Sequence, residues 1–577
     1  MLRLLLLPIA AWPLLAGAQE RIAARVVDAS TGAPLMHATV AIIGTGSGTI
    51  TNADGAFALA LRTGRDSLRI SYVGYRTVRL PFSAALHGAS IALTRSPVEL
   101  AALEVRPEAD LYKRVARAAG RLRRAPEAKA KAYYNLQTHS DGEPVERLQA
   151  CYTAQYRGGG LRSLAIKQGR IGIAPKEDRH FINFNTAGAL LLLDPFGGNG
   201  RLPVSPLSFT SGRQLRQHYT VRMVAASAGP DDGDHLRAEP IDGNGLRLDL
   251  WLDPVGDAVH ALELHCRNCR RHPFVPLFKD GRIDSVSLRY RQTWSLDTPA
   301  MPQLIELDYS MRYTGPGISD RFTTRAVLHA FETGEGFVPV LFPWRTGLEE
   351  YPSMAWLPVD TAFWQRQELP VPAERLESDE AFIQQHEVAR NNWFAGIGQQ
   401  QYDLRPPYRI WSDGARIDSL HISGSPRVVV PGSGRKPAVH LRTHLYLDLD
   451  TAGGALRHRS FAVFSGRESW HSTPWSPASA VLTNLFFDLA EAERRAMELR
   501  LQVPGMTLAR AREIHAEHTR RMRQEQERLL RYGLQDSIHL LAWNRRIRES
   551  LGIDNVERLL RFAQPQAPPP FEPAITR

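Results

Sequence analysis

The sequence predicts an α+β protein, with a small N-terminal β-sandwich, a large antiparallel β-sheet body and a C-terminal helical region. Residues 22–94 contain short β-branched runs separated by turn residues, which is typical of a sandwich. Between residues 131 and 331, apolar and polar residues alternate in longer segments joined by short turns, which indicates hairpins. From residue 480 onward the apolar residues recur at helical spacing instead.

The first 18 residues have the features of a secretory signal peptide. Arg3 precedes an apolar run from Leu4 to Leu15, and Ala16-Gly-Ala18 offers a small-residue cleavage site. The run is shorter than the about 20 apolar residues that a membrane-spanning helix needs, and no comparable run follows it in the sequence. We therefore expect an exported protein without a transmembrane span after signal cleavage, in the periplasm or at the outer membrane.

The length of the chain indicates how many domains it has, and its charge indicates what kind of partner it could bind. The roughly 560 residues that follow the signal peptide predict three to four domains, at about 100–200 residues each. The net charge of +11 favours contact with acidic envelope polymers or lipid head groups. It is equally consistent with arginines on the solvent faces of the C-terminal helices. Export argues against nucleic acid as the natural partner.

The stretch from residue 22 to residue 94 has the most specific pattern in the chain. Its distinctive segments are Val26-Val-Asp, Thr31-Gly-Ala-Pro-Leu, Ala38-Thr-Val, Gly44-Thr, Gly48-Thr-Ile-Thr, Asp54-Gly-Ala-Phe and Ile70-Ser-Tyr-Val-Gly-Tyr. They resemble the carboxypeptidase regulatory-like domain, a small Ig- or transthyretin-like β-sandwich at the front of many exported proteins of Bacteroidetes type. That module has no peptidase active site in its family. The resemblance therefore implies a location and an architecture rather than a reaction.

The next domain is expected at residues 107–335, as a helix followed by the antiparallel sheet. The helix is predicted from Pro107 to Arg124, because Leu111, Val115 and Leu122 recur at helical spacing. The body is similar, more weakly, to uncharacterised exported proteins with the same N-terminal module, through segments such as Ala132-Tyr-Tyr-Asn, Asp360-Thr-Ala-Phe-Trp and Asn484-Leu-Phe-Phe-Asp. The hairpin that begins at Leu248-Asp-Leu-Trp-Leu-Asp-Pro also resembles hairpins of periplasmic lipoprotein carriers, which gives a hint about the fold only.

The C-terminal half is expected to contain four segments. Residues 336–400 are Pro- and Trp-rich and predict an irregular connector, with one helix from about Ser378 to Asn391 that Ser378 caps. Residues 405–465 predict a second β region, and residues 478–563 a helical region. The Pro-rich tail at residues 564–577 is expected to be disordered.

The three cysteines leave several alternatives open. Cys266 and Cys269 are flanked by His265 and His272, which would complete a set of four zinc ligands. However, neighbouring residues of a strand point to opposite sides, which separates His265 from Cys266. Thioredoxin-like redox chemistry is expected near a βαβ unit, whereas this motif ends a β-strand. A local disulfide, or a bridge from either cysteine to Cys151, is the plainer explanation in an oxidising compartment. Three nearby arginines would lower the pKa of any free thiol: Arg267, Arg270 and Arg271.

Two pairs of residues in predicted strands have the composition of metal ligands. His260 and Glu263 show the His-x-x-Glu spacing of a metallocarboxypeptidase, but strand alternation places them on opposite faces, so that one ion cannot bind both. We therefore disfavour a metallocarboxypeptidase. His440 and His444 would lie about 13 Å apart along a strand, too far to share an ion. We expect them on a solvent-facing sheet surface, together with Tyr446 and other polar residues, and a binding face is the alternative.

The predicted helix from Thr507 to Tyr532 has one apolar face, formed by Leu508, Ala511, His515, His518, Met522 and Leu529. We expect this face to pack on the preceding β region, and attachment to an anionic membrane or a partner helix is the alternative. His515 and His518 lie one turn apart but lack the His-Glu-x-x-His order of zinc proteases, so we interpret them as part of a polar helix face.

No segment shows a recognised catalytic motif. The chain has no Gly-x-Ser-x-Gly, and the glycine-rich stretch at Gly44 lies between two predicted strands instead of opening a helix. We assign no catalytic, cofactor-binding or metal-binding residue. The expected function is that of a non-enzymatic binding or scaffolding protein of the bacterial cell envelope, whose partner is an envelope protein, glycan or lipid. The alternatives are a hydrolase of glycans or peptides with a dispersed site, and a carrier of lipids or lipoproteins.

Overall fold

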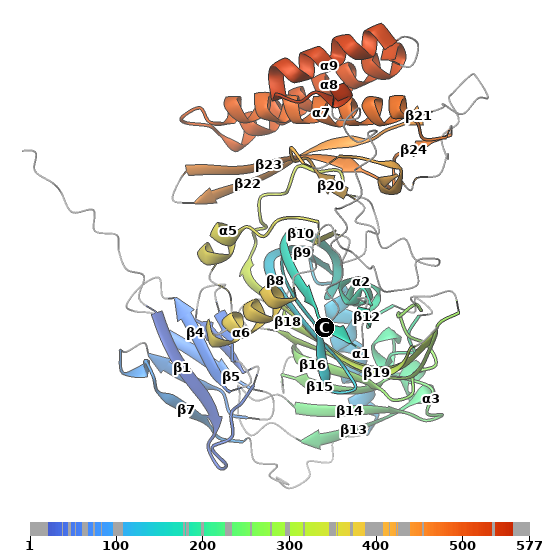
Figure 1. The fold of residues 1–577 in the computed structure, drawn as a ribbon. Helices are drawn as coiled ribbons and strands as arrows, with labels where there is room; N and C mark the ends of the chain where they lie inside the picture. Colours follow the sequence, from blue (N-terminus) through green and yellow to red (C-terminus); the bar gives the residue numbers. More distant parts are fainter. Residues whose placement is uncertain are drawn as a thin grey trace, which may run out of the picture.

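A computed structural model gives the fold of the chain (Figure 1). It describes residues 21–557, apart from residues 37, 44–47, 52–53, 61–66, 73–74, 82–83, 96–107, 177–178, 181–183, 198–200, 226–233, 254–256, 277–279, 295–300, 316–317, 345–352, 355, 368, 370–372, 387–407, 415, 423, 425–438, 453–454, 473 and 534–536. The predicted signal peptide, most of the glycine-rich stretch at Gly44 and the predicted disordered tail lie outside the described residues. No described helix combines the length and the apolar character needed to cross a membrane.

The N-terminal region is a β-sandwich, as the sequence predicts. One sheet has the order β4-β1-β7, with bounds Ala56–Ala60, Arg21–Asp28 and Ser90–Leu93. The other has the order β3-β2-β5-β6, with bounds Gly48–Ile50, Thr39–Ile42, Ser67–Ser71 and Val78–Pro81. Side chains such as Val26, Val40 and Phe57 are buried between the two sheets. Burial of alternate side chains from both sheets stabilises such a sandwich.

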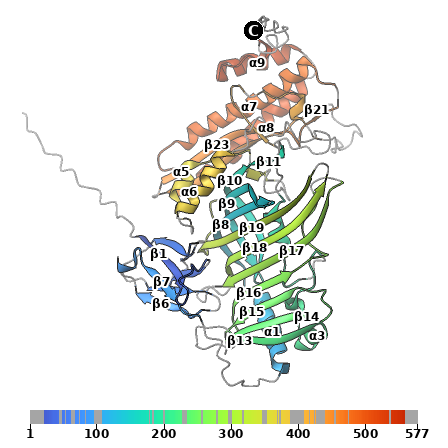
Figure 2. The same cartoon turned by 60° about the horizontal axis from the view of Figure 1, so that its bottom comes forward.

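The body is one ten-stranded sheet in which every neighbouring pair is antiparallel. Its order is β10 (Gly160–Ile173), β9 (Glu143–Arg157), β8 (Ala128–Ser140), β19 (Ile318–Thr333), β18 (Pro302–Gly315), β17 (Arg282–Trp294), β16 (Val259–Cys266), β15 (Arg247–Leu252), β14 (Asp234–Pro240) and β13 (Tyr219–Ala225). The first and last strands of the body, β8 and β19, pair at Ala326 and Leu136. This pairing joins two runs of consecutive hairpins into one sheet, which Figure 2 shows as a long curved surface.

Helices cover the inner face of this sheet. They are α1 (Glu108–Arg123), α2 (Thr186–Leu192) and α3 (Gly212–His218). Their apolar side chains, among them Leu111, Val115 and Leu215, share one core with strand residues such as Leu250 and Leu307. The result is the α+β class that the sequence predicts.

Two further helices, α5 (Thr361–Arg366) and α6 (Ala373–Gln385), belong to the predicted connector. The helix predicted to begin at Ser378 begins five residues earlier, so that Ser378 lies within the helix and is not its cap. The neighbouring Asp379 is buried and accepts a hydrogen bond of 2.8 Å from Asn135 of β8. The contact of α6 with the outer face of the sheet through this carboxylate requires residue 379 to lie within the helix, so the helix begins before Ser378.

The C-terminal part combines small sheets with three helices. One sheet has the order β20-β23-β22, with bounds Tyr408–Ile410, Ala455–Ser465 and Thr443–Ala452, and β21 (Val439–His440) pairs with β24 (Trp470–His471). The helices are α7 (Pro477–Leu501), α8 (Leu508–Gly533) and α9 (Ser537–Leu551). Ala511, Met522 and Leu529 of α8 are buried in a core shared with α7 and β22. The expectation that this face of α8 packs on the preceding β region is confirmed.

One expectation about this region is wrong. The face of β22 that holds His444 and Tyr446 does not meet solvent, because both side chains are buried. Residues of the predicted connector cover it: Phe342 packs against both rings, at centroid distances of 5.5 and 5.7 Å, and Leu341 and Leu447 exchange backbone hydrogen bonds. His440 moreover lies in the separate strand β21. A segment distant in sequence thus supplies the second layer that the strand pattern alone does not reveal.

Candidate functional site

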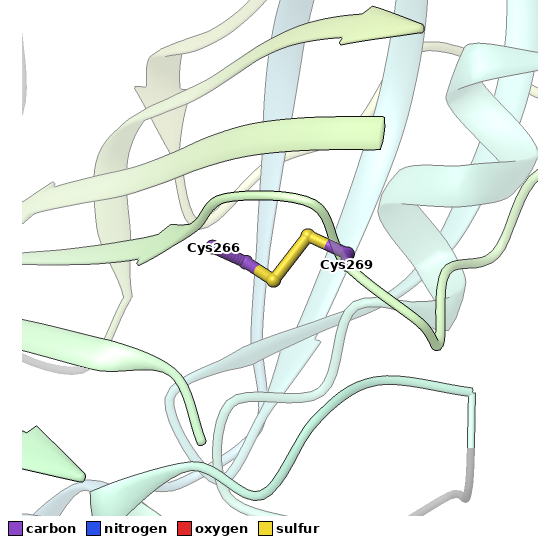
Figure 3. Close-up of a disulfide and its surroundings, with 2 residues drawn as sticks. All are labelled: Cys266 and Cys269. Atoms are coloured by element: carbon purple, nitrogen blue, oxygen red, sulfur yellow. A yellow bond between two sulfur atoms is a disulfide. The ribbon is translucent and has the colours of Figure 1, made fainter. Parts of the chain in front are cut away.

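The cysteine motif closes a tight turn at the end of β16 (Figure 3). Cys266 and Cys269 form a disulfide with a Cα–Cα distance of 5.7 Å. Between them, Asn268 adopts a left-handed conformation with φ 51°, which asparagine tolerates better than most residues. Cys151 is buried and free, and burial raises the pKa of its thiol. Of the alternatives for the three cysteines, the structure therefore contains the local disulfide. Because Cys266 and Cys269 have no free thiol, the predicted effect of the arginines on the pKa of a thiol does not apply to them.

A hollow of about 1140 Å³ lies beside this turn. We call it the arginine hollow, because five arginines and a single carboxylate, that of Asp308, line it. The arginines are Arg247 of β15, Arg289 of β17, and Arg267, Arg270 and Arg271 of the disulfide turn and the residues after it. Such an excess of positive charge in a concave surface attracts anions.

The five arginines differ in their partners. Arg247 Nε lies 3.3 Å from Asp249 Oδ2, and Arg289 contacts Glu263 Oε1 and Asp308 Oδ2, each at 3.0 Å. These ion pairs hold the two strand arginines in place in the lining of the hollow. The remaining three, Arg267, Arg270 and Arg271, are exposed, and none of them forms an ion pair with another described residue. Their charges are available to a ligand.

The strands that contribute to the hollow have an alternating belt of charged side chains on the outer face of the sheet. His265 Nε2 lies 2.6 Å from Glu263 Oε1, and His235 Nε2 lies 2.8 Å from Asp249 Oδ1. Burial raises the pKa of Glu263, but hydrogen bonds from His265 and Arg289 outweigh it and lower the pKa to about 2. Burial also raises the pKa of Asp249, but hydrogen bonds from His235 and Arg237 outweigh it and lower the pKa to about 2. Both carboxylates are ionised at neutral pH, which does not suit a general acid.

The charged belt predicts that the folded protein loses stability at acidic pH. Because the pKa values of Glu263 and Asp249 are lower in the folded protein than their ordinary values of 4.5 and 3.8, each carboxylate stabilises the fold above its ordinary pKa. That contribution, on the order of 2 kcal/mol each, is lost as the pH falls from about 4.5 to about 2. We expect urea unfolding to show this loss, and Glu263→Gln to reduce the difference in stability between pH 6 and pH 3. An unchanged pH dependence in Glu263→Gln would contradict the assignment.

Strand alternation holds for Glu263, but β16 is irregular at His260, because Trp251 pairs with Ala261 and Leu252 pairs with Val259. Leu262 and Leu264 are buried in the inner core, whereas Glu263 points to the outer face with His265. His272 instead stacks on Phe274, at a centroid distance of 6.0 Å. Within the part of the chain that the structure describes, no three His, Cys, Asp or Glu side chains converge as a metal site would require.

The histidines of α8 are structural, and their assignment to a polar helix face is wrong. His518 is 1% exposed and its Nδ1 lies 2.9 Å from Glu493 Oε2 of α7. His515 Nε2 lies 3.0 Å from the carbonyl oxygen of Leu445 in β22. Both rings therefore join α8 to its neighbours. Their position on the apolar face of the helix was the sequence signal for this role.

Comparison with known proteins identifies one part of the chain. Residues 22–102 are a CarboxypepD_reg-like domain. The match confirms the resemblance predicted for residues 22–94 and covers the N-terminal sandwich. The CarboxypepD_reg-like domain lies beside the outer face of the ten-stranded sheet, where Met36 Sδ is 3.3 Å from Arg325 Nη1 of β19. No curated protein matches the chain.

Three solved structures show a limited similarity to the chain. A DUF1329 family protein from Desulfovibrio piger has 10% identity and a TM-score of 0.15, with 42% of this chain and 96% of that chain covered. The Pseudomonas aeruginosa MucA/MucB complex has 10% identity and a TM-score of 0.14, with 38% and 93% covered. The LolA superfamily protein NE2245 from Nitrosomonas europaea has 11% identity and a TM-score of 0.17, with 39% and 93% covered. At these TM-scores, none of the three similarities supports an argument about function.

The arginine hollow was not predicted from the sequence. Arg247 and Arg289 are 42 residues apart in the chain and meet only because β16 lies between β15 and β17. The available signal was the alternation in these strands, in which charged residues such as Arg247, Asp249, Glu263 and Arg289 occupy one face.

Proposed function

We propose that this protein is a non-enzymatic binding protein of the bacterial cell envelope and that the arginine hollow holds an anionic ligand. The observation that supports this proposal is that three exposed arginines of the hollow, Arg267, Arg270 and Arg271, form no ion pair with another described residue, whereas Arg247 and Arg289 contact carboxylates. The planar guanidinium group donates two parallel hydrogen bonds to a carboxylate or a phosphate. Both groups are common in envelope glycans and lipid head groups, so the ligand class follows from the chemistry of the lining.

The same features disfavour the two alternatives. A carrier of acyl chains is expected to offer a cavity lined mainly by apolar side chains, whereas five arginines contribute to the lining of this hollow. A hydrolase is expected to keep a carboxyl group or an imidazole poised to transfer a proton. Glu263 and Asp249 instead hold low pKa values through ion pairs with arginine and histidine. The charged belt therefore serves to orient Arg247 and Arg289 rather than to transfer protons.

Isothermal titration of the chain without its first 18 residues would test the proposal. The probes are an oligogalacturonate for carboxylates, inositol hexaphosphate for phosphates, and a neutral maltooligosaccharide as the reference. We expect binding of at least one anionic probe and none of the reference. The triple variant Arg267→Gln/Arg270→Gln/Arg271→Gln is expected to weaken that binding about threefold to hundredfold, since each exposed ion pair contributes about 0.2–1 kcal/mol.

A matched variant separates the hollow from the overall charge. Arg512→Gln/Arg520→Gln/Arg523→Gln removes three exposed charges from α8 and is expected to leave the affinity nearly unchanged. Cys266→Ser/Cys269→Ser keeps all the arginines but frees the turn, and is expected to weaken binding a few-fold through lost preorganisation. If the α8 variant loses as much affinity as the hollow variant, or if no anionic probe binds, the proposal is wrong.

A further inference from the structure

The far end of the α8–α9 hairpin exposes a group of large apolar side chains. Tyr532, Ile538 and Leu541 are 43%, 71% and 52% exposed. The rings of Tyr532 and His539 stack at a centroid distance of 5.9 Å, which brings the end of α8 against the start of α9. We call these three apolar residues the hairpin tip. In Figures 1 and 2, α9 lies at the outer end of the molecule, away from the ten-stranded sheet.

Arginines surround the hairpin tip. Between Arg528 and Arg548 the sequence has five arginines and one acidic residue, Asp536. Arg531 and Arg545 are exposed, and neither forms an ion pair with another described residue. Arg528 Nη1 lies 2.9 Å from Glu525 Oε1, and Arg546 Nη1 lies 2.6 Å from Glu525 Oε2. The two arginines therefore share one carboxylate. The tip therefore combines exposed apolar side chains with a net positive rim.

We propose that the hairpin tip binds an anionic lipid surface, with Ile538 and Leu541 entering the head-group region and the arginine rim contacting lipid phosphates. Basic amphipathic helices bind membranes in this way, through buried apolar area and attraction to anionic lipids. A second copy of the chain would place two positive rims against each other, so charge complementarity favours lipid. The hairpin tip and the arginine hollow lie on different elements, and this inference does not depend on the proposed ligand of the hollow.

Co-sedimentation with lipid vesicles tests this proposal. The chain without its first 18 residues is expected to bind vesicles of phosphatidylglycerol mixed with phosphatidylcholine and to bind phosphatidylcholine vesicles much more weakly. Ile538→Ser/Leu541→Ser is expected to reduce binding by at least about tenfold, the effect of withholding one buried aliphatic side chain. Arg531→Gln/Arg545→Gln is expected to reduce it by about fivefold or more per charge, and added salt should lower binding of the wild type.

Matched exposed residues supply the control. Leu499 and Val503 are 72% and 56% exposed and lie where α7 leads into α8, at the opposite end of α8 from the hairpin tip. Leu499→Ser/Val503→Ser is expected to bind anionic vesicles as the wild type does. The triple variant of the arginine hollow is also expected to keep vesicle binding, which separates the two proposals. Equal loss of vesicle binding in the Leu499/Val503 variant, or equal binding to both vesicle types, would overturn the inference. It would also be overturned if the protein formed dimers instead of binding vesicles and Ile538→Ser/Leu541→Ser made those dimers dissociate.

Discussion

Arg114→Met is expected to lower the free energy of unfolding by about 3–5 kcal/mol, because it removes a buried guanidinium group that contacts two carboxylates, those of Asp234 and Asp257. Arg114 lies on α1 and is 2% exposed, with Nη1 2.6 Å from Asp234 and Nε 2.7 Å from Asp257. Its Nη2 also donates to the carbonyl oxygen of Asp253, at 3.1 Å. One guanidinium group thus joins α1 to β14 and to the connection between β15 and β16. Urea unfolding followed by circular dichroism would measure the loss.

Arg117 provides the matched control for this prediction. It contacts the same carboxylate, with Nε 2.8 Å from Asp257 Oδ2, but its side chain is 53% exposed. Arg117→Met is therefore expected to cost less than about 1 kcal/mol. Arg114→Lys keeps the charge but cannot reach both carboxylates with one planar group, so we expect an intermediate loss. Equal effects of the Arg114 and Arg117 substitutions to Met would show that burial of the Arg114 cluster does not determine its contribution.

Lys167→Met is expected to have a similar effect, about 3–5 kcal/mol, on the stability of the contact between the body and the C-terminal sheet. Lys167 of β10 forms a buried ion pair with Asp448 of β22, with side chains 2% and 6% exposed. Its Nζ also donates to the carbonyl oxygens of Leu449 and Val338, at 2.6 and 3.0 Å. Removal of the ammonium group takes away the cation that the two carbonyl oxygens and the Asp448 carboxylate share, and Gln168 offers the carboxylate a hydrogen bond but no charge. Thermal unfolding of wild type and variant would report the difference.

Two variants test the cause of this loss. Lys167→Met/Asp448→Leu removes both charges and is expected to recover much of the stability, because no buried charge remains unpaired. Lys131→Met removes a lysine from an ion pair with Glu332 whose side chains are 22% and 39% exposed, and is expected to cost about 1 kcal/mol or less. If the double variant is as unstable as Lys167→Met, the burial of an unpaired charge is not the reason for the loss.

The position of Lys167 follows from an irregularity in β10. Ile166 pairs with Tyr152 and Gln168 pairs with Cys151, so Lys167 is an extra residue in the register. In a regular strand, neighbouring side chains point to opposite faces. The bulge instead lets both residues reach one carboxylate, and Gln168 Nε2 lies 2.6 Å from Asp448 Oδ2. No pattern in the sequence of β10 indicates this bulge.

The burial of Arg114 could be predicted from the sequence, but its partners could not. It occurs next to Val115 and three residues after Leu111, on the stripe that predicts the buried face of the helix. A charged residue on such a stripe indicates a buried ion pair, but not its partners. Asp234 and Asp257 are more than 100 residues away, and only the curvature of the sheet brings them to α1.

The sequence by itself determined the CarboxypepD_reg-like domain, the α+β class and the side of the strand to which Glu263 points. These follow from local rules: turn residues set the hairpins, and the period of two sets the face. Tertiary structure alone decided that the polar face of β22 is buried and that Arg247, Arg289 and the disulfide turn form one hollow. Both depend on which segments become neighbours across the sheet, and that choice is made by packing over long distances in the chain rather than by the spacing of residues within a strand.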